Sequence, residues 1–291
     1  MYKLGKTINM GSSSNGNAFY LELHRKDYPN PFRLLIECGF DYKTLATKMV
    51  EKGLSMNDIN AVLVTHEHLD HAQSVQELVR RGFKVYAPQS VYERFNLLET
   101  TDKRYIISEM KEKSIADGIK VFGFPLDHEN DDGSSTYNLG YVITVDDTFK
   151  ILFVTDTKHI RWNLSEYQFN VIFIEANNLH RVIYFALKTA QENHDTWKIM
   201  HFTRVLKSHM LAEKTAKTLA TFDLSKTDLI YLIHLSSFTQ VNTYEFKGII
   251  SDKLKETRQF RMVQYTDKTT NKLKLARRPK IIVAKRNGDW T

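Results

Sequence analysis

The stretch that decides the fold is Ile59-Asn60-Ala61-Val62-Leu63-Val64-Thr65-His66-Glu67-His68-Leu69-Asp70-His71, an apolar run followed at once by three histidines and two carboxylates. The β-branched run up to Thr65 predicts a buried strand, because it contains neither glycine nor proline. Apolar residues recur at helical spacing from Ala72 onward, so a helix is expected to end near Gly82. The polar cluster therefore lies in a predicted strand-to-helix loop.

The spacing within this cluster favours metal binding. On a helix, His66 and His68 would point to roughly opposite sides, whereas in an extended turn they can converge on one ion. Asp70 and His71 face a different direction and suit a second ion. Imidazole with carboxylate is the ligand set of Zn²⁺, Mn²⁺ or iron, and not of calcium. We therefore expect a divalent-metal site; the alternative is an exposed histidine-rich loop without metal.

Three more polar residues follow apolar runs later in the chain, at the ends of predicted strands. These residues are His128, Asp156 and His234. A carboxylate such as Asp156 can bridge two cations held ~3.5–4 Å apart. A packing histidine or a turn-capping aspartate is the alternative for each position taken alone. Together with the first cluster, they extend the predicted metal site.

A polar loop from Gly11 to Asn17 joins two short predicted strands near the beginning of the chain. It is rich in glycine, serine and asparagine, so we expect a hairpin loop that does not pack. Its backbone N–H groups and hydroxyls can face a phosphate; the alternative is a plain turn. The loop residues that we expect to bind substrate are Ser13, Ser14, Asn15 and Asn17.

Length and composition set the class of protein. The 291 residues contain 42% hydrophobic residues and no internal repeat or Pro/Gly linker, so a single domain over 1–291 is the simplest interpretation. Cys38 is the one cysteine and cannot form an internal disulfide. The first residues lack a signal-peptide pattern, and no apolar run reaches the ~20 residues of a spanning helix. We therefore expect a cytoplasmic protein without a membrane partner.

The net charge of +7 is concentrated in a basic C-terminal segment, residues 253–291. Between positions 253 and 286 there are twelve lysines and arginines against two acids, Glu256 and Asp267. This segment is expected to pack on the domain or to be appended to it. A surface for a polyanion, nucleic acid first, is the functional interpretation; a solvated lysine-rich face without a partner is the alternative.

The pattern HxHxDH at 66–71, followed by His128, Asp156 and His234, resembles the metallo-β-lactamase superfamily. The resemblance implies an α+β fold, a four-layer αββα sandwich with the metal site along one edge. It implies that His66, His68 and His128 hold one ion. It implies that Asp70, His71 and His234 hold the other, and that Asp156 bridges the two divalent ions.

Four segments, 11–17, 35–39, 174–177 and 234–236, are similar to the bacterial YycJ/WalJ-like branch. That branch is associated with DNA exonuclease activity, and a neighbouring branch with cyclic phosphodiesterases. The similarity adds Asn177 and Ser236 to the expected substrate-binding residues. Three departures from the pattern occur. Glu37 stands where the family usually has Asp, Asn178 stands where the branch usually has His, and residues 237–240 replace the Asn-rich continuation expected after 234–236. These changes affect substrate handling more than metal binding.

The function implied is a dinuclear metal-dependent phosphodiesterase, a nuclease that hydrolyses DNA through a metal-bridging hydroxide. Asp70 is expected to relay a proton, and His209 to hold a phosphate or protonate the leaving oxygen. The alternatives are a small-molecule hydrolase, acting on a cyclic nucleotide, thioester or lactone, and a non-catalytic nucleic-acid-binding module. The segment 180–209 is longer than the resemblance implies, and is interpreted as a lid or as a contact in a homo-oligomer.

Overall fold

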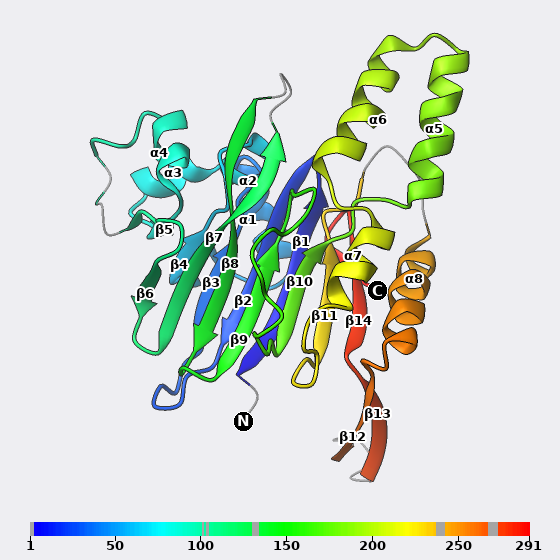
Figure 1. The fold of residues 1–291 in the computed structure, drawn as a ribbon. Coiled ribbons are helices and arrows are strands. Elements are labelled where there is room, and N and C mark those ends of the chain that lie inside the picture. Colours follow the sequence, from blue (N-terminus) through cyan, green and yellow to red (C-terminus); the bar gives the residue numbers. More distant parts are fainter. Residues whose placement is uncertain (1–2, 101, 103–104, 130–133, 237–241, 267–272) are drawn as a thin grey trace.

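Two β-sheets lie face to face in the centre of the molecule, and helices cover their outer faces (Figure 1). This computed structural model describes residues 3–100, 102, 105–129, 134–236, 242–266 and 273–291. Between the sheets, the ring of Phe19 packs edge-on against Phe153, with centroids 5.7 Å apart, and lies 6.3 Å from Phe173. The expected α+β class and four-layer αββα sandwich are confirmed.

The smaller sheet has five strands in sequence order. They are β1 (Leu4–Ser13), β2 (Gly16–Leu23), β3 (Phe32–Ile36), β4 (Ala61–Leu63) and β5 (Val85–Tyr86). The first three pair antiparallel and the last three pair parallel. Its outer face is covered by α1 (Tyr42–Glu51), a 3₁₀ turn (Met56–Asp58), α2 (Leu69–Ala72), α3 (Val75–Arg80) and α4 (Gln89–Arg94).

The larger sheet has eight strands in the order β15-β14-β11-β10-β9-β8-β7-β6. They are β6 (Glu112–Ala116), β7 (Ile119–Glu129), β8 (Ser135–Val145), β9 (Phe149–Val154), β10 (Val171–Glu175), β11 (Leu229–Ile233), β14 (Lys280–Lys285) and β15 (Asp289–Trp290). The four strands β9, β10, β11 and β14 are parallel, so their carboxyl ends share one edge. Two helices, α7 (Ala212–Leu219) and α8 (Thr243–Glu256), supply the outer layer.

A helical hairpin stands away from the sandwich at the upper right of Figure 1. It consists of α5 (His180–Glu192) and α6 (Thr196–Ser208), which pack on each other through a small apolar core of their own. The two helices are separate because Asp195 caps α6 by accepting a hydrogen bond from the backbone N–H of Lys198 at 3.1 Å. The long segment 180–209 is therefore an appended helical hairpin.

The basic C-terminal segment is divided between two places. Its middle part forms a separate ribbon of β12 (Arg261–Thr266) and β13 (Leu273–Arg278), while β14 joins the large sheet beside β11. Because β14 starts at Lys280 and runs parallel to β11, the ribbon lies at the edge where the parallel strands begin, at the bottom of Figure 1. Lys268 and Lys272 lie outside the described residues.

The structure differs from the sequence-based expectation in the first hairpin. Gly11, Ser12 and Ser13 continue β1, and the turn is confined to Ser14 and Asn15. Hence the prediction of an unpacked loop from Gly11 to Asn17 is wrong for most of that stretch. None of the helices within the described ranges has the length and hydropathy that crossing a bilayer requires.

Candidate metal centre

The candidate site lies at the edge of the sandwich where β4, β9, β10 and β11 end. His66 follows β4 after two residues, Asp156 follows β9 after one, and His234 comes directly after β11. His128 reaches the same edge from near the end of β7. All four side chains are at least 95% buried. Polar residues that follow different strands in the sequence thus form one cluster in space.

Two groups of candidate ligands form around the shared carboxylate of Asp156. The first contains His66, His68 and His128, and the second contains Asp70, His71 and His234; in each group the ligand atoms lie within 4.8 Å of one another. His128 Nε2 is 3.6 Å and His66 Nε2 3.9 Å from Asp156 Oδ2. The structure therefore brings together the seven expected ligands.

In the second group, the other oxygen of Asp156 is the common neighbour. Oδ1 of Asp156 is 3.1 Å from His234 Nε2 and 3.4 Å from His71 Nε2. Asp70 Oδ2 is 3.3 Å from His71 Nε2 and 3.6 Å from His234 Nε2. Because each oxygen of Asp156 faces a different group, this carboxylate is placed as a bridge between two cations would be.

Several buried nitrogens of the cluster have no hydrogen-bond partner within the described residues. They include His66 Nε2 and His234 Nε2, which face Asp156, as well as His71 Nδ1 and His128 Nδ1. An unsatisfied buried polar atom is costly, and native proteins rarely tolerate several together. Divalent cations beside Asp156 would satisfy His66 Nε2 and His234 Nε2, whereas His71 and His128 turn their other nitrogen, Nε2, toward Asp156. These residues therefore fit a metal site of imidazole and carboxylate ligands.

The electrostatics of the two groups differ. Burial holds the pKa of His66 well below its usual range, and burial also lowers the pKa of His128 to about 3 although Asp156 opposes this. Burial acts in the same direction on His234, but the carboxylates of Asp156, Asp70 and Glu175 outweigh it and raise its pKa to about 10. His66 and His128 are thus neutral imidazoles, whereas His234 holds a proton that a cation would displace.

Glu37 supports both groups from the smaller sheet. Its Oε1 accepts a hydrogen bond from Thr65 Oγ1 at 2.6 Å, and Thr65 Oγ1 lies 2.9 Å from His66 Nδ1. Oε1 also lies 3.5 Å from His71 Nδ1. Such partners of a metal-binding imidazole fix its ring orientation. The longer side chain at a position where the family usually has Asp therefore still serves the centre.

Glu175, at the end of β10, was not among the expected site residues. Its Oε1 lies 2.7 Å from His209 Nδ1 and 3.0 Å from His234 Nδ1. The ring of His209 stacks on that of His234 with centroids 5.3 Å apart. His209, the C-cap residue of α6, is thereby oriented beside the candidate ligands. The position of Glu175 at a strand end was the sequence signal that would have identified it.

Three buried asparagines hold the backbone of the candidate ligands. Each donates from Nδ2 to a carbonyl oxygen: Asn17 to Asp70 at 3.1 Å, Asn138 to Asp156 at 2.7 Å and Asn177 to His234 at 3.2 Å. Asp156 and His234 need such support because both have positive φ, 48° and 56°, an uncommon conformation for residues with a side chain. Ser12 adds a further contact, since its Oγ accepts from the N–H of His234 at 2.7 Å.

The expected substrate-binding residues divide into two kinds. Asn17 and Asn177 lie inside the centre and use their amides on backbone oxygens, and Ser13 and Ser236 are buried near them. Ser14 and Asn15 are exposed at the turn between β1 and β2. This turn is the part of the predicted loop that is open to solvent.

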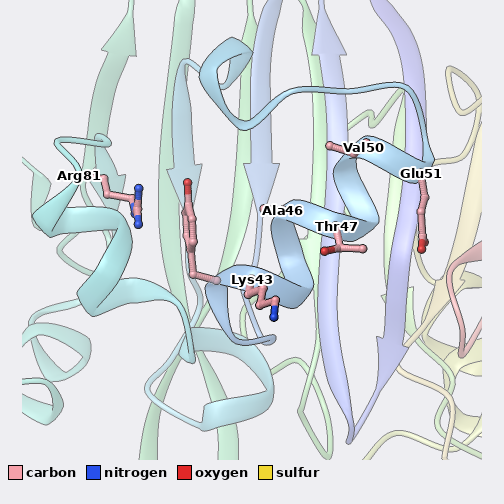
Figure 2. Close-up of a pocket in the computed structure, with 7 residues that line it drawn as sticks. Lys43, Ala46, Thr47, Val50, Glu51 and Arg81 are labelled. Carbon is pink, nitrogen blue, oxygen red and sulfur yellow. The ribbon is translucent and has the colours of Figure 1, made fainter.

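A separate groove runs beside α1 on the outer helical layer (Figure 2). It is lined by Tyr42, Lys43, Ala46, Thr47, Val50, Glu51 and Arg81, with the Arg81 guanidinium 4.2 Å from the centre of the Tyr42 ring. None of these residues belongs to the histidine and aspartate cluster. The groove is therefore distinct from the candidate metal centre.

The αββα sandwich with this cluster at its edge defines the class of protein, a metal-dependent hydrolase. A family model described as "Beta-lactamase superfamily domain" matches residues 32–235. The chain therefore belongs to the β-lactamase superfamily, and the matched range contains all seven expected ligands. The resemblance to this superfamily is confirmed.

Sequence relatives point to the expected branch. The chain is 27% identical to exodeoxyribonuclease WalJ of Streptococcus pneumoniae over 237 residues, covering 78% of this chain and 80% of that protein. It is 26% identical to exodeoxyribonuclease YycJ of Bacillus anthracis, with 78% and 81% covered. Among solved structures, unliganded yeast PDE1 has a TM-score of 0.61 at 11% identity, covering 97% of this chain and 98% of that one. The last similarity supports the fold alone.

Proposed function

We propose that the protein is a dinuclear metal-dependent phosphodiesterase, and that it is a nuclease acting on DNA. The observation that carries this proposal is the placement of Asp156 between two ligand groups. Its Oδ2 lies near His128 of the first group, and its Oδ1 lies near His234 of the second. Two bound divalent cations would lower the pKa of water and neutralise the charge that develops on the phosphate oxygens. This chemistry suits hydrolysis without a protein nucleophile.

The residues of the site have two roles, as metal ligands and as supports of those ligands. His66, His68, His128 and Asp156 would hold one Zn²⁺ or Mn²⁺ ion, and Asp70, His71, His234 and Asp156 the other. Glu37 and Glu175 fix the imidazole rings, and the three asparagines fix the backbone of Asp70, Asp156 and His234. A centre built in this way is oriented before substrate arrives, which lowers the cost of reaching the transition state.

His209 is our candidate for the general acid. Its Nδ1 lies 2.7 Å from Glu175 Oε1, and an ionised carboxylate only accepts hydrogen bonds, so the proton of this pair belongs on Nδ1. Nε2 is then the atom that can carry a second proton to the leaving oxygen. Asp70 would act as a ligand of the second ion, and the proton relay that we expected of it would take place beside that ion.

The choice of DNA rests on the names of the relatives and on charge. Proteins called exodeoxyribonuclease are similar to this chain over more than three quarters of its length. The β12–β13 ribbon is at the opposite edge from the cluster, so its cations would contact only parts of a long polyanion far from the reacting phosphate. A single domain over residues 1–291, supported by the pairing of β14 with β11, is part of this proposal.

A substrate panel tests the proposal. Purified protein with Mn²⁺ or Zn²⁺ is incubated with end-labelled single- and double-stranded DNA, RNA, cyclic nucleotides and bis(p-nitrophenyl) phosphate. We expect cleavage of DNA and of the small diester, two metal ions per chain by elemental analysis, and loss of activity in Asp70→Ala. Asp127→Asn is the matched control, because Asp127 lies on the same strand as His128 but pairs with Arg161 outside the cluster.

Activity confined to cyclic nucleotides, or to thioesters and lactones added to the panel, would replace the nuclease by a small-molecule hydrolase. DNA binding without cleavage of any diester, at full metal occupancy, would instead favour a non-catalytic binding module. Affinity for DNA should fall steeply between about 50 and 200 mM salt, because binding a polyanion releases counterions. Binding that does not respond to salt would count against nucleic acid as the substrate.

A further inference from the structure

One face of α6 runs from exposed Trp197 at its outer end, through half-buried His201 and Arg204, to buried Ser208 beside the candidate metal centre. Trp197, His201, Arg204 and Ser208 are four, three and four residues apart, so they lie on one side of the helix. The apolar side chains of α6 that pack toward α5 lie on the other side, and Phe202 and Val205 are the buried ones among them. We call this face, Trp197 to Ser208, the α6 track. At ~1.5 Å per residue it is roughly 16 Å long.

The outer end of the α6 track is an aromatic platform. The rings of Trp197 and His201 are parallel within 3°, with centroids 5.4 Å apart. The Trp197 side chain is still 57% exposed, and neighbouring Met200 is 71% exposed. Soluble proteins seldom leave a tryptophan in this state, and a flat indole supported from beneath by a second ring is suited to stacking with another planar group.

The inner end of the α6 track is the centre itself. His209 immediately follows the last residue of α6, and its ring is 5.7 Å from that of His128 and 5.3 Å from that of His234. His201 lies near enough to His209 for the two charges to interact: burial lowers the pKa of His201, and the charge of His209 lowers it further. A ligand lying on the track would therefore continue directly into the cluster.

The charge of α6 matches a polyanion. Its thirteen residues include Arg204 and Lys207, as well as Lys198, which pairs with the N-cap residue Asp195 at 2.8 Å, and they include no Asp or Glu. The cations of the β12–β13 ribbon are at the far edge of the large sheet, so they cannot serve a ligand at this position. Positive charge beside the candidate centre thus comes from the hairpin.

We propose that the α6 track binds a single-stranded segment of the nucleic acid whose phosphate is being hydrolysed, with a base stacked on Trp197 and phosphates beside the cations of α6. This inference rests on the proposed function. Stacking on an aromatic side chain requires an unpaired base, which single strands and frayed duplex ends offer. A second copy of the chain covering Trp197 and Met200 is the competing occupant, and the alternating cations on the same helix disfavour it.

The test measures binding separately from catalysis. A fluorescein-labelled single-stranded oligonucleotide of twenty thymidines is titrated with metal-free protein, and anisotropy gives the dissociation constant. Trp197→Ala should weaken binding roughly 5- to 100-fold, since stacking of one base is worth that much, and Trp197→Phe should recover most of it. Tyr184→Ala is the matched control, because Tyr184 is an equally exposed aromatic residue (62%) on α5. It should bind as the unmodified chain does.

The result is kept distinct from the proposed function by a small substrate. Bis(p-nitrophenyl) phosphate is too short to reach Trp197, so Trp197→Ala with metal should hydrolyse it at the unmodified rate. Equal oligonucleotide affinity of Trp197→Ala and Tyr184→Ala would overturn the α6 track. So would a dimer in sedimentation that Trp197→Ala converts to monomer without loss of oligonucleotide binding. If the small diester is not hydrolysed at all, the proposed function fails while the binding result still stands.

Discussion

Asn138, in the middle of β8, donates a hydrogen bond from Nδ2 to the carbonyl oxygen of Asp156 at 2.7 Å and a second to that of Thr155 at 3.0 Å. The two contacts hold the turn after β9, in which Asp156 has a φ of 48°. Thr155 Oγ1 also donates to Asp156 Oδ1 at 2.8 Å. The carboxylate shared by both ligand groups is thus held through its backbone and through one of its oxygens.

Replacement of Asn138 tests this arrangement. We expect Asn138→Ala to weaken metal binding by roughly 10- to 100-fold, the usual effect of removing a group that supports a metal ligand. The loss of stability should be about 1–3 kcal/mol, because two buried carbonyl oxygens lose their donor. Competition with a chelating dye measures the affinity. Asn163→Ala, at a site whose side chain only accepts from Ser165 N in an exposed turn, is the control. Equal affinities of the two variants would show that Asn138 is dispensable.

Metal removal should destabilise the protein. The buried nitrogens of His66 and His234 have no partner among the described residues, so cations that bind the folded chain stabilise it by mass action. At a metal concentration 100 times the dissociation constant the gain is ~2.7 kcal/mol, or roughly 5–10 °C in melting temperature for a chain of this size. Calorimetry before and after EDTA treatment measures it. His66→Ala should reduce the response without abolishing it, because the group of Asp70, His71, Asp156 and His234 remains. An unchanged melting temperature in the unmodified chain would contradict the metal centre.

Much of the site could be predicted because its residues follow strand ends. His66, Asp156 and His234 each come after an apolar run, and the carboxyl ends of parallel strands meet at one edge. Asn138 gave no such signal, because it stands inside a strand and its role depends on a turn seventeen residues away. Local sequence does not encode that proximity.

The first hairpin was predicted less well for a physical reason. Gly11 and Gly16 suggested a flexible loop, but a Cβ at either position would lie within 2.4 Å of the Phe40 ring. These glycines make room for an aromatic side chain and do not loosen the turn. Helix α8 was missed although Phe246, Ile250 and Leu254 recur every four residues and are buried on the large sheet.

Acidification should lower the free energy of unfolding of the metal-free protein. The pKa of His128 is about 3 in the folded chain against about 6.5 unfolded, so between these values the unfolded chain binds more protons. Stability is then complete above pH 6.5 and falls as the pH drops toward 3, by up to ~1.4 kcal/mol per pH unit for this histidine. Urea unfolding at pH 6.5, 5.5 and 4.5 measures the slope. His128→Gln should reduce it, whereas the exposed His180→Gln should not; identical slopes would contradict the assignment.

Glu175 should matter for turnover more than for metal binding. In Glu175→Gln the amide cannot replace a carboxylate that faces His209 Nδ1 and His234 Nδ1 together, so the His209 ring loses the contact that orients it. We expect kcat to fall by about 10²–10⁴, the range of general acid–base catalysis. Glu213→Gln, which alters an exposed acceptor of the His180 N–H, is the control. A normal kcat and pH profile would exclude the role of His209 as acid.

Gly39 makes the sharpest prediction about how the chain builds the centre. A Cβ at this position would lie 1.7 Å from the carbonyl oxygen of Asp70 and 2.8 Å from the backbone N of His71, and no rotamer relieves a clash with backbone. Gly39→Ala must therefore push the turn that carries Asp70 and His71 away from Asp156. Because His66 and His128 reach Asp156 from other strands, we expect this variant to keep one metal ion per chain and lose the second, together with hydrolysis of bis(p-nitrophenyl) phosphate.

Gly53→Ala, where the added Cβ meets nothing within 4 Å, controls for the substitution itself, although its positive φ costs some stability. Two ions bound to Gly39→Ala with unmodified affinity would show that Asp70 and His71 do not depend on this close approach.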